Sequence, residues 1–383
     1  MKEKEFVTEL EKTDNRRNSV LILVMVFCVF GLSFLCWFKE EESFSESERR
    51  VLEKFPPMSM ETILNGNFME KFEAYSLDQF PFRDEFRGIK ALASYGLFQK
   101  KDNNDIYIAQ GHLSKMEYPM QTKMLDHAAT KMEEIYNMYL KDQGSTCYFS
   151  IIPDKNYFLA EKNGYLSMDY DELFSYMKEK IHFAEYIDIC DFLSLEDYYT
   201  TDTHWRQEKI TDVAKHLKDV MLNEAMQTDS TEFETKELEF PFYGVYYGQA
   251  ALPIKPDVLY YLESDILRQC KVTSYDTGKA KETVIYNMEK AKGNDAYEIF
   301  LSGTSALQVI ENPNVKTKKE LIVFRDSFGS SLIPLLADSY SKITVIDIRY
   351  VQSRMLGNLV DFQGQDTLFI YSTVILNNSM SLR

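Results

Sequence analysis

The clearest indication of the fold is the stretch LIVFRDSFGSSLI, residues 321–333. Its first four residues are apolar and mostly β-branched or aromatic, which is typical of a strand buried on both faces. Asp326, Ser327 and Gly329 interrupt this run before a helix-like stretch begins at Leu332. In such a strand–turn–helix unit the serine hydroxyl lies at the carboxyl edge of the sheet, where open α/β sheets bind ligands. Asp and Ser also favour helix N-caps, so this segment alone leaves a nucleophile and a plain cap both open.

Other segments have the same buried-strand character. These apolar runs are Cys147 to Ile152, Ile343 to Ile348 and Thr367 to Val374. Helical spacing of apolar residues is found at 121–140 and 207–222. Apolar strands separated by helices predict an α/β fold, a parallel sheet with helices on both faces. Short strands are further expected at 105–108 and 187–189.

An uncharged run extends from Ser19 to Phe38. Twenty residues of helix span about 30 Å, the thickness of the bilayer hydrocarbon core. Arg16 and Arg17 precede the run and an acidic stretch follows it, so the positive-inside rule places the N-terminus in the cytoplasm. The run is longer than the apolar region of a cleaved signal peptide and lacks its small-residue cleavage site. An uncleaved transmembrane anchor is therefore predicted.

The anchor divides the expected organisation of the chain into four parts. These are a cytoplasmic tail at 1–18, a transmembrane helix at 19–38, a stem and helical lead-in at 39–100, and the α/β domain at 101–383. The lead-in includes Asp78 to Asp84, which contains a proline and is expected to be a structural helix junction.

The net charge of −17 lies beyond the anchor, because residues 1–18 carry five basic and five acidic side chains. An acidic domain repels phosphate backbones, which argues against nucleic-acid binding. The five cysteines show no CxxC or Cys/His spacing, so neither a metal site nor a disulfide framework is predicted. No glycine-rich phosphate loop or dinucleotide fingerprint is present, and no cofactor is predicted.

A second polar segment, Thr201-Asp202-Thr203-His204-Trp205, supplies what a serine nucleophile needs. Histidine is the usual base near neutral pH, and a carboxylate fixes its tautomer and stabilises the imidazolium. Asp202 and His204 stand two residues apart in a loop before a helix. The alternative is a surface Asp and His beside a structural Trp205.

Together these segments resemble the DHHW proteins of bacteria and, more distantly, the alginate O-acetylation proteins of the AlgJ and AlgX type. The resemblance is carried by several ordered motifs: Glu48 to Leu52, Asp78 to Asp84, Ile152 to Lys155, Thr201 to Trp205, Phe242 to Gly244, Arg325 to Gly329 and Ile346 to Tyr350. It implies a permuted SGNH-hydrolase-like fold in which Ser327 is the nucleophile, His204 the base and Asp202 the residue that orients it.

The chain departs from these patterns at three places. Thr203 stands where the family name implies a second His, and Arg325 stands where ordinary SGNH enzymes have Gly. No Gly-x-Asn-Asp block supplies a side-chain oxyanion donor. The remaining oxyanion or substrate-binding candidates are Phe328, Gly329, Arg349 and Tyr350. The alternative for Arg349 is a surface ion pair, and the alternative for Tyr350 is an aromatic side chain that packs in the core.

The resemblance implies a serine O-acetyltransferase that modifies hydroxyls of a cell-surface polysaccharide or wall glycan outside the membrane. Because acetyl-CoA is absent there, it also implies a membrane-bound O-acyltransferase as the partner that exports the acyl group. An O-acetyl esterase would use the same triad with water as acceptor. The alternative that is not an enzyme is a glycan-binding scaffold protein.

Overall fold

The computed structural model describes residues 15–45, 47–48, 50–222, 231–276, 278–293, 295–315 and 317–383. Most of the expected cytoplasmic tail thus lies outside the described residues. The chain divides into two compact units, Met1–Ala93 and Ser94–Arg383.

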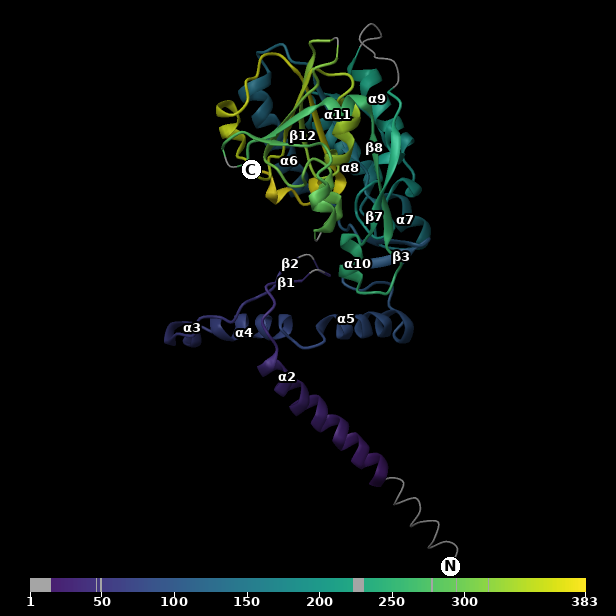
Figure 1. The fold of residues 1–383 in the computed structure, drawn as a ribbon, viewed down its shortest axis with the longest axis vertical. Coiled ribbons are helices and arrows are strands. Elements are labelled where there is room, and N and C mark those ends of the chain that lie inside the picture. The colour runs from purple at the N-terminus through teal and green to yellow at the C-terminus, as the bar shows by residue number, and fades with distance from the viewer. Residues whose placement is uncertain are drawn as a thin grey trace, which may run out of the picture. The chain divides into compact units, whose positions relative to one another are not determined.

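The centre of the second unit is a mixed sheet (Figure 1). In the described part of the chain its eight strands run in the order β10 (Lys281–Thr283), β9 (Lys271–Ser274), β11 (Leu307–Glu311), β13 (Lys342–Ile346), β12 (Glu320–Arg325), β14 (Asp366–Ser372), β5 (Cys147–Ile152) and β6 (Glu185–Tyr186). The five strands from β13 to β6 are parallel. The others are antiparallel. The carboxyl ends of β12, β14 and β5 therefore meet at one edge.

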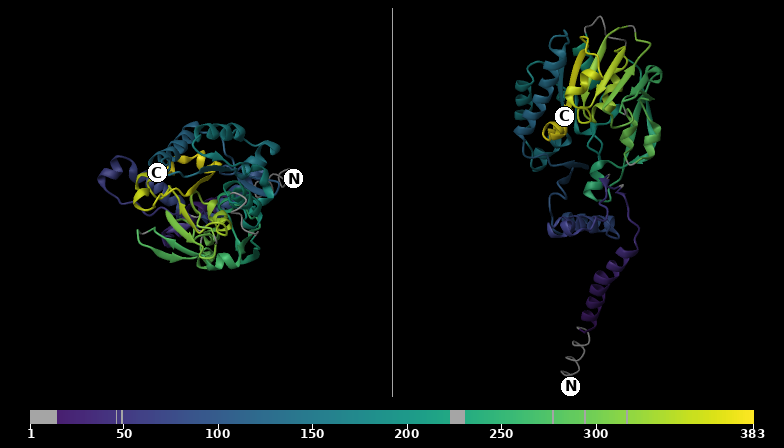
Figure 2. Two further views of the ribbon diagram at one scale, coloured as in Figure 1. Left: turned by 90° about the horizontal axis from the view of Figure 1, so that it is seen from above. Right: turned by 90° about the vertical axis from the view of Figure 1, so that its left-hand side faces the viewer.

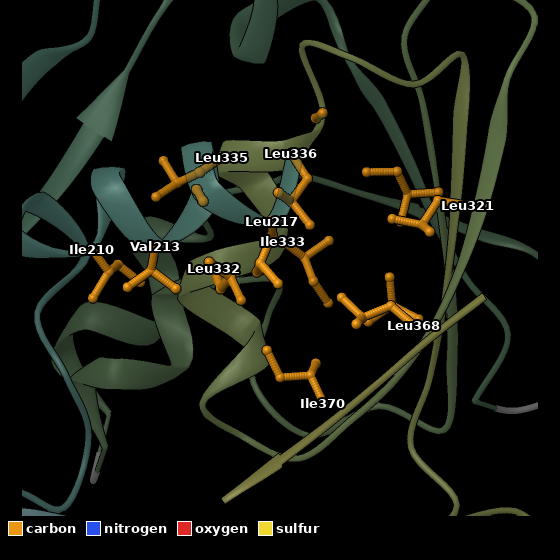
Figure 3. Close-up of a cluster of buried hydrophobic side chains, with 14 of the residues drawn as sticks. Ile210, Val213, Leu217, Leu321, Leu332, Ile333, Leu335, Leu336, Leu368 and Ile370 are labelled. Atoms are coloured by element: carbon orange, nitrogen blue, oxygen red, sulfur yellow. The ribbon is translucent and has the colours of Figure 1, made fainter. Parts of the chain in front are cut away.

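Side chains of alternate residues along β12 enter two different cores. Leu321 and Val323 pack in one cluster with α9 (Thr211–Met221), α12 (Gly329–Leu332) and the 3₁₀ turn η10 (Ile333–Leu336). Figure 3 shows Leu321 with residues of these elements. Ile322 and Phe324 pack in the other cluster, with α6 (Thr122–Ile135) and α8 (Tyr170–Lys180). Because strand side chains alternate between faces, helices cover both faces of the sheet. The predicted α/β class is confirmed, and Figure 2 shows the layers from two further directions.

This unit also contains two separate antiparallel pairs and four short helices. The pairs are β3 (Ile106–Ala109) with β4 (His112–Lys115) and β7 (Glu234–Phe242) with β8 (Asp257–Glu263), and the helices are α7 (Lys155–Asn163), α10 (Val245–Ala250), α11 (Asp265–Gln269) and α13 (Thr373–Leu376). The strand expected at 187–189 is wrong in position: β6 lies at Glu185–Tyr186, and Ile189 precedes a 3₁₀ turn.

The first unit begins with the helix Asn15–Phe38, which is long and apolar enough to cross a membrane and is not buried by the rest of the chain. A π-turn, η1 (Phe27–Gly31), precedes its last segment α2 (Leu32–Phe38). A short hairpin follows, β1 (Phe44–Ser45) with β2 (Arg50–Val51). The unit ends with α3 (Met60–Leu64), α4 (Asn67–Asp78) and α5 (Arg83–Leu92).

Candidate active site

Ser327 lies in the turn between β12 and α12, as the sequence predicts. The carboxylate of Asp326 closes this turn from both sides: it accepts the N–H of Phe328 at 3.0 Å and the N–H of Ser372, at the end of β14, at 2.7 Å. The N–H of Gly329 donates to the carbonyl of Asp326 at 3.1 Å. The turn is thereby fixed to the neighbouring strand.

Asp202 and His204 lie in a loop that an isolated bridge between Tyr198 and Trp205 closes. Nδ1 of His204 is 2.6 Å from Oδ1 of Asp202, and Nε2 of His204 is 2.8 Å from Oγ of Ser327. Segments 123 positions apart in the sequence thus meet at hydrogen-bonding distance. Both Asp202 and His204 are buried, whereas Ser327 is partly exposed.

This chain of contacts fixes the imidazole tautomer. A carboxylate only accepts hydrogen bonds, so the 2.6 Å contact requires that Nδ1 of His204 carry the proton. Nε2 then has a lone pair directed at the Ser327 hydroxyl. This is the arrangement in which a histidine can remove the proton of a serine hydroxyl.

The second oxygen of Asp202 is held by the main chain. Oδ2 accepts the N–H of Val245 at 2.8 Å, at the start of α10. The preceding Gly244 makes this approach feasible, since a Cβ there would lie 2.3 Å from the nitrogen of Asp202 and from the carbonyl of Thr201. Real Cβ atoms do not come so close, so only glycine fits at this position.

Lys155, the first residue of α7, supports the same loop. Its Nζ donates to the carbonyls of Tyr199 and Thr200 at 2.9 and 3.2 Å, and the side chain is almost completely buried. Burial lowers the pKa of Lys155 to about 7, although the nearby carboxylates of Asp202 and Asp257 act in the opposite direction. The lysine therefore connects the segment that follows β5 to the loop that carries His204.

Aromatic side chains enclose the imidazole. The ring of Tyr297 stacks on His204 with 3.9 Å between centroids, and the ring of Phe328 is tilted against it at 4.9 Å. The Tyr297 hydroxyl and the indole N–H of Trp205 both reach Oγ of Ser331, at 2.8 and 3.0 Å. Trp205 is thus a structural partner of the nucleophile turn.

The oxyanion candidates are placed differently from the triad residues. The N–H groups of Phe328 and Gly329 both donate to Asp326, as described above. Arg349 forms a bidentate ion pair with Asp347, and Tyr350 is half exposed beside it. In the part of the chain that the structure describes, the N–H of Ser327 itself has no acceptor.

The sequence alone does not predict two residues that contribute to the site. Tyr297 lies far from both motifs in the sequence, and no local pattern marks a ring that stacks on a distant histidine. Val245 contributes a backbone N–H, which does not depend on the type of its side chain. The one sequence feature that could indicate this contact is the neighbouring Gly244.

Comparisons with known proteins agree with this fold. The family model described as DHHW protein matches residues 169–346, a span that includes Asp202, His204 and Ser327. A crystal structure of a DHHW family protein from Eubacterium siraeum aligns with a TM-score of 0.57 and 20% identity, over 73% of this chain and 95% of that one. The match of the family model confirms the resemblance to the DHHW family. No curated protein sequence matches the chain.

Bacillus cereus PatB1 is similarly close in structure, with a TM-score of 0.57 and 17% identity over 71% of this chain and 96% of that one. A further PatB1 structure carries a sulfonyl adduct. At these identities the likeness shows the fold. The O-acetyltransferase domain of Pseudomonas putida AlgJ aligns with a TM-score of 0.39 and 13% identity, over 67% of this chain and 84% of that domain, a likeness too distant to add to the argument.

Proposed function

This chain matches the DHHW family over residues 169–346, and from that premise we propose that it is an extracytoplasmic serine acyltransferase. It transfers acetyl groups to hydroxyls of a cell-surface polysaccharide through an acyl-serine. The observation that supports this proposal most is the unbroken contact chain from Asp202 through His204 to Ser327.

In the first half-reaction, Nε2 of His204 takes the proton of the Ser327 hydroxyl while Oγ attacks the acyl carbonyl carbon. Asp202 stabilises the imidazolium that forms. The tetrahedral intermediate collapses when the bond to the donor's oxygen breaks, and His204 returns the proton to that oxygen. The products are the acyl-serine and the donor alcohol.

In the second half-reaction, a sugar hydroxyl attacks the acyl-serine and His204 takes its proton. The bond between the acyl carbon and Oγ then breaks, and Oγ of Ser327 recovers the proton. The negative charge that develops on the carbonyl oxygen needs donors that point at it. The free N–H of Ser327 is the donor we assign, because those of Phe328 and Gly329 are engaged by Asp326.

The helix Asn15–Phe38 is proposed to anchor the protein, with Arg16 and Arg17 on the cytoplasmic side and residues 39–383 outside. Since acetyl-CoA is confined to the cytoplasm, an acyl donor must arrive through the membrane. A membrane-bound O-acyltransferase is the partner we propose for that step. The orientation can be tested with a membrane-impermeant thiol reagent on intact cells. The reagent should label a cysteine placed at Ser43. Labelling of this cysteine only after lysis would show that residue 43 lies in the cytoplasm, the reverse of the proposed orientation.

The full chain in detergent micelles tests the activity. A sulfonyl fluoride should label Ser327 and abolish turnover of an activated acetyl ester. Adding an oligosaccharide acceptor should then divert acetyl groups from water to sugar, detected as an acetylated product by mass spectrometry. Turnover with water as the sole acceptor would instead make the protein an esterase. Absence of both labelling and turnover would support the non-catalytic scaffold.

A further inference from the structure

Helix α5 of the first unit exposes its apolar side. Phe82 precedes the helix in a left-handed conformation, and Phe86 and Ile89 lie three positions apart on one face of it. Their exposed fractions are 56%, 44% and 61%. A surface helix of a soluble protein normally turns this face toward the core.

The charged side of α5 is the side that faces the protein. Arg83 and Arg87 form ion pairs with Glu48 at 2.7 and 3.3 Å, and their side chains are only 19% and 16% exposed. Ala91, on the same side, is fully buried. The two arginines are therefore better covered than the phenylalanines of the same helix, an inversion of the pattern that water favours.

Helix α3 has a similar exposed set. Met60 and Leu64, one turn apart, are 75% and 81% exposed, with Ile63 beside them. Ser59 caps this helix through the N–H of Thr62. Contiguous apolar surface of this kind marks a contact with something outside the chain.

Hydrogen bonds join the end of α4, which leads into α5, to the residues that follow the apolar helix Asn15–Phe38. The Tyr75 hydroxyl of α4 donates to the carboxylate of Glu41 at 2.9 Å. The main chain of Glu42 exchanges two hydrogen bonds with the amide of Gln79, at 3.0 and 2.9 Å. Glu41 is three residues beyond Phe38, so the chain between them spans about 10 Å at most. The end of α4 and the start of α5 thus lie next to the carboxyl end of the apolar helix Asn15–Phe38 (Figure 1).

We propose that α5, together with α3, lies in the headgroup–acyl boundary of the bilayer that helix Asn15–Phe38 crosses, with Phe86 and Ile89 inserted among the lipids. This inference rests on the proposed anchor. Acidic side chains outnumber basic ones over residues 39–93. Attraction to anionic lipid therefore does not hold the helix, and burial of apolar surface does. A zwitterionic bilayer should be sufficient.

The test is photo-crosslinking of the purified full chain in phosphatidylcholine vesicles, with p-benzoyl-phenylalanine in place of Ile89. Asp84, 59% exposed on the opposite side of α5, is the matched control position, and Phe34 in the anchor is the positive control. We expect lipid adducts at positions 89 and 34, with a yield at 89 at least about fivefold that at 84. Ile89 and Phe34 are exposed, so their replacement should leave the fold intact. Replacing Asp84 removes its ion pairs with Arg83 and Arg87 at 3.7 and 3.3 Å, so circular dichroism of each variant must first match that of the wild type.

Two outcomes would overturn the proposal in distinguishable ways. A lipid adduct at 34 with none at 89 would leave the anchor standing and remove α5 from the bilayer. Absence of lipid adducts at 34 would reject the anchor itself, and this inference with it. In native membranes, a crosslink from position 89 to a protein instead of a lipid would replace the bilayer with a protein partner as the occupant of this face.

Discussion

The carboxyl edge of the sheet and helix α5 depart from the usual apolar-inside pattern in opposite directions. At the edge, Asp202 and Asp326 are completely buried, yet the chain provides N–H donors for both of their carboxylates. On α5, Phe86 and Ile89 remain 44% and 61% exposed, although the ring of Phe86 contacts that of Phe80 at 5.7 Å. The first departure is compensated within the protein and the second is not. A buried, satisfied cluster indicates a complete site, whereas an uncovered apolar face indicates a missing partner.

The largest effect we predict is at the complete site. Ser327→Ala should lower kcat for an activated acetyl ester by about 10³-fold or more, because alanine removes the attacking oxygen and leaves the turn in place. Steady-state kinetics of the full chain would measure this. Ser330→Ala is the control and should remain near wild type. Ser331 is unsuitable as a control, because its hydroxyl contacts Trp205 and Tyr297. Retention of wild-type turnover by Ser327→Ala would end the nucleophile assignment.

Gly244→Ala should break the support of Asp202 without touching a reacting atom. The added Cβ would lie 2.3 Å from the Asp202 nitrogen, so the loop must shift. We expect a loss of about 1–3 kcal/mol of unfolding free energy and about 10²-fold in kcat. Gly96→Ala is the matched control, since nothing lies within 4 Å of its added Cβ. If both variants keep their melting temperature and kcat, the close approach at Gly244 is not essential.

Lys155 should make stability depend on pH. Its pKa is about 7 in the folded protein and about 10.4 in an unfolded chain. Between these values the unfolded state holds a proton that the folded state has released, so stability rises with pH across this window. Relative to Lys155→Met, the wild type should gain about 1 kcal/mol per pH unit from pH 7 toward 10, with no gain below pH 7.

Denaturant unfolding of the full chain in micelles, followed by near-UV circular dichroism, would measure the difference. Lys162→Met is the control, because Lys162 is exposed at the other end of α7. Parallel pH profiles of the wild type and Lys155→Met would show that the buried amine keeps its charge.

The sequence predicts the parallel strands well because each is buried on both faces and reads as an unbroken apolar run. Cys147–Ile152 matches β5 at both ends, and β12 extends the expected 321–324 by one residue on each side. The antiparallel strands β9 and β10 were not predicted, since exposed polar side chains dilute their pattern. Short polar strands of this kind acquire their structure from neighbours rather than from a local signal.

The site was predictable where side chains carry the chemistry and unpredictable where backbone or packing does. Asp202, His204 and Ser327 were singled out by residue type and spacing, and the structure brings them together. The Val245 N–H and the Tyr297 ring had no comparable signal, because any residue has an N–H and many aromatics pack. Arg349 pairs with Asp347, but this ion pair is largely buried rather than at the surface. The catalytic roles themselves stay predictions.

The smallest effect we predict concerns the exposed apolar face of α5. In a soluble form that begins at Lys39, replacing Phe86 and Ile89 by serine should change local stability of α5 by no more than about 0.5 kcal/mol, because exposed side chains lose little packing. Ala91→Ser, on the buried side of the same helix, should cost about 1–3 kcal/mol by leaving a hydroxyl without a partner. Hydrogen exchange of the amides of residues 83–92 reports both values locally. If the exposed pair destabilises α5 as much as Ala91→Ser does, these side chains pack against the protein, and the apolar face needs no lipid to cover it.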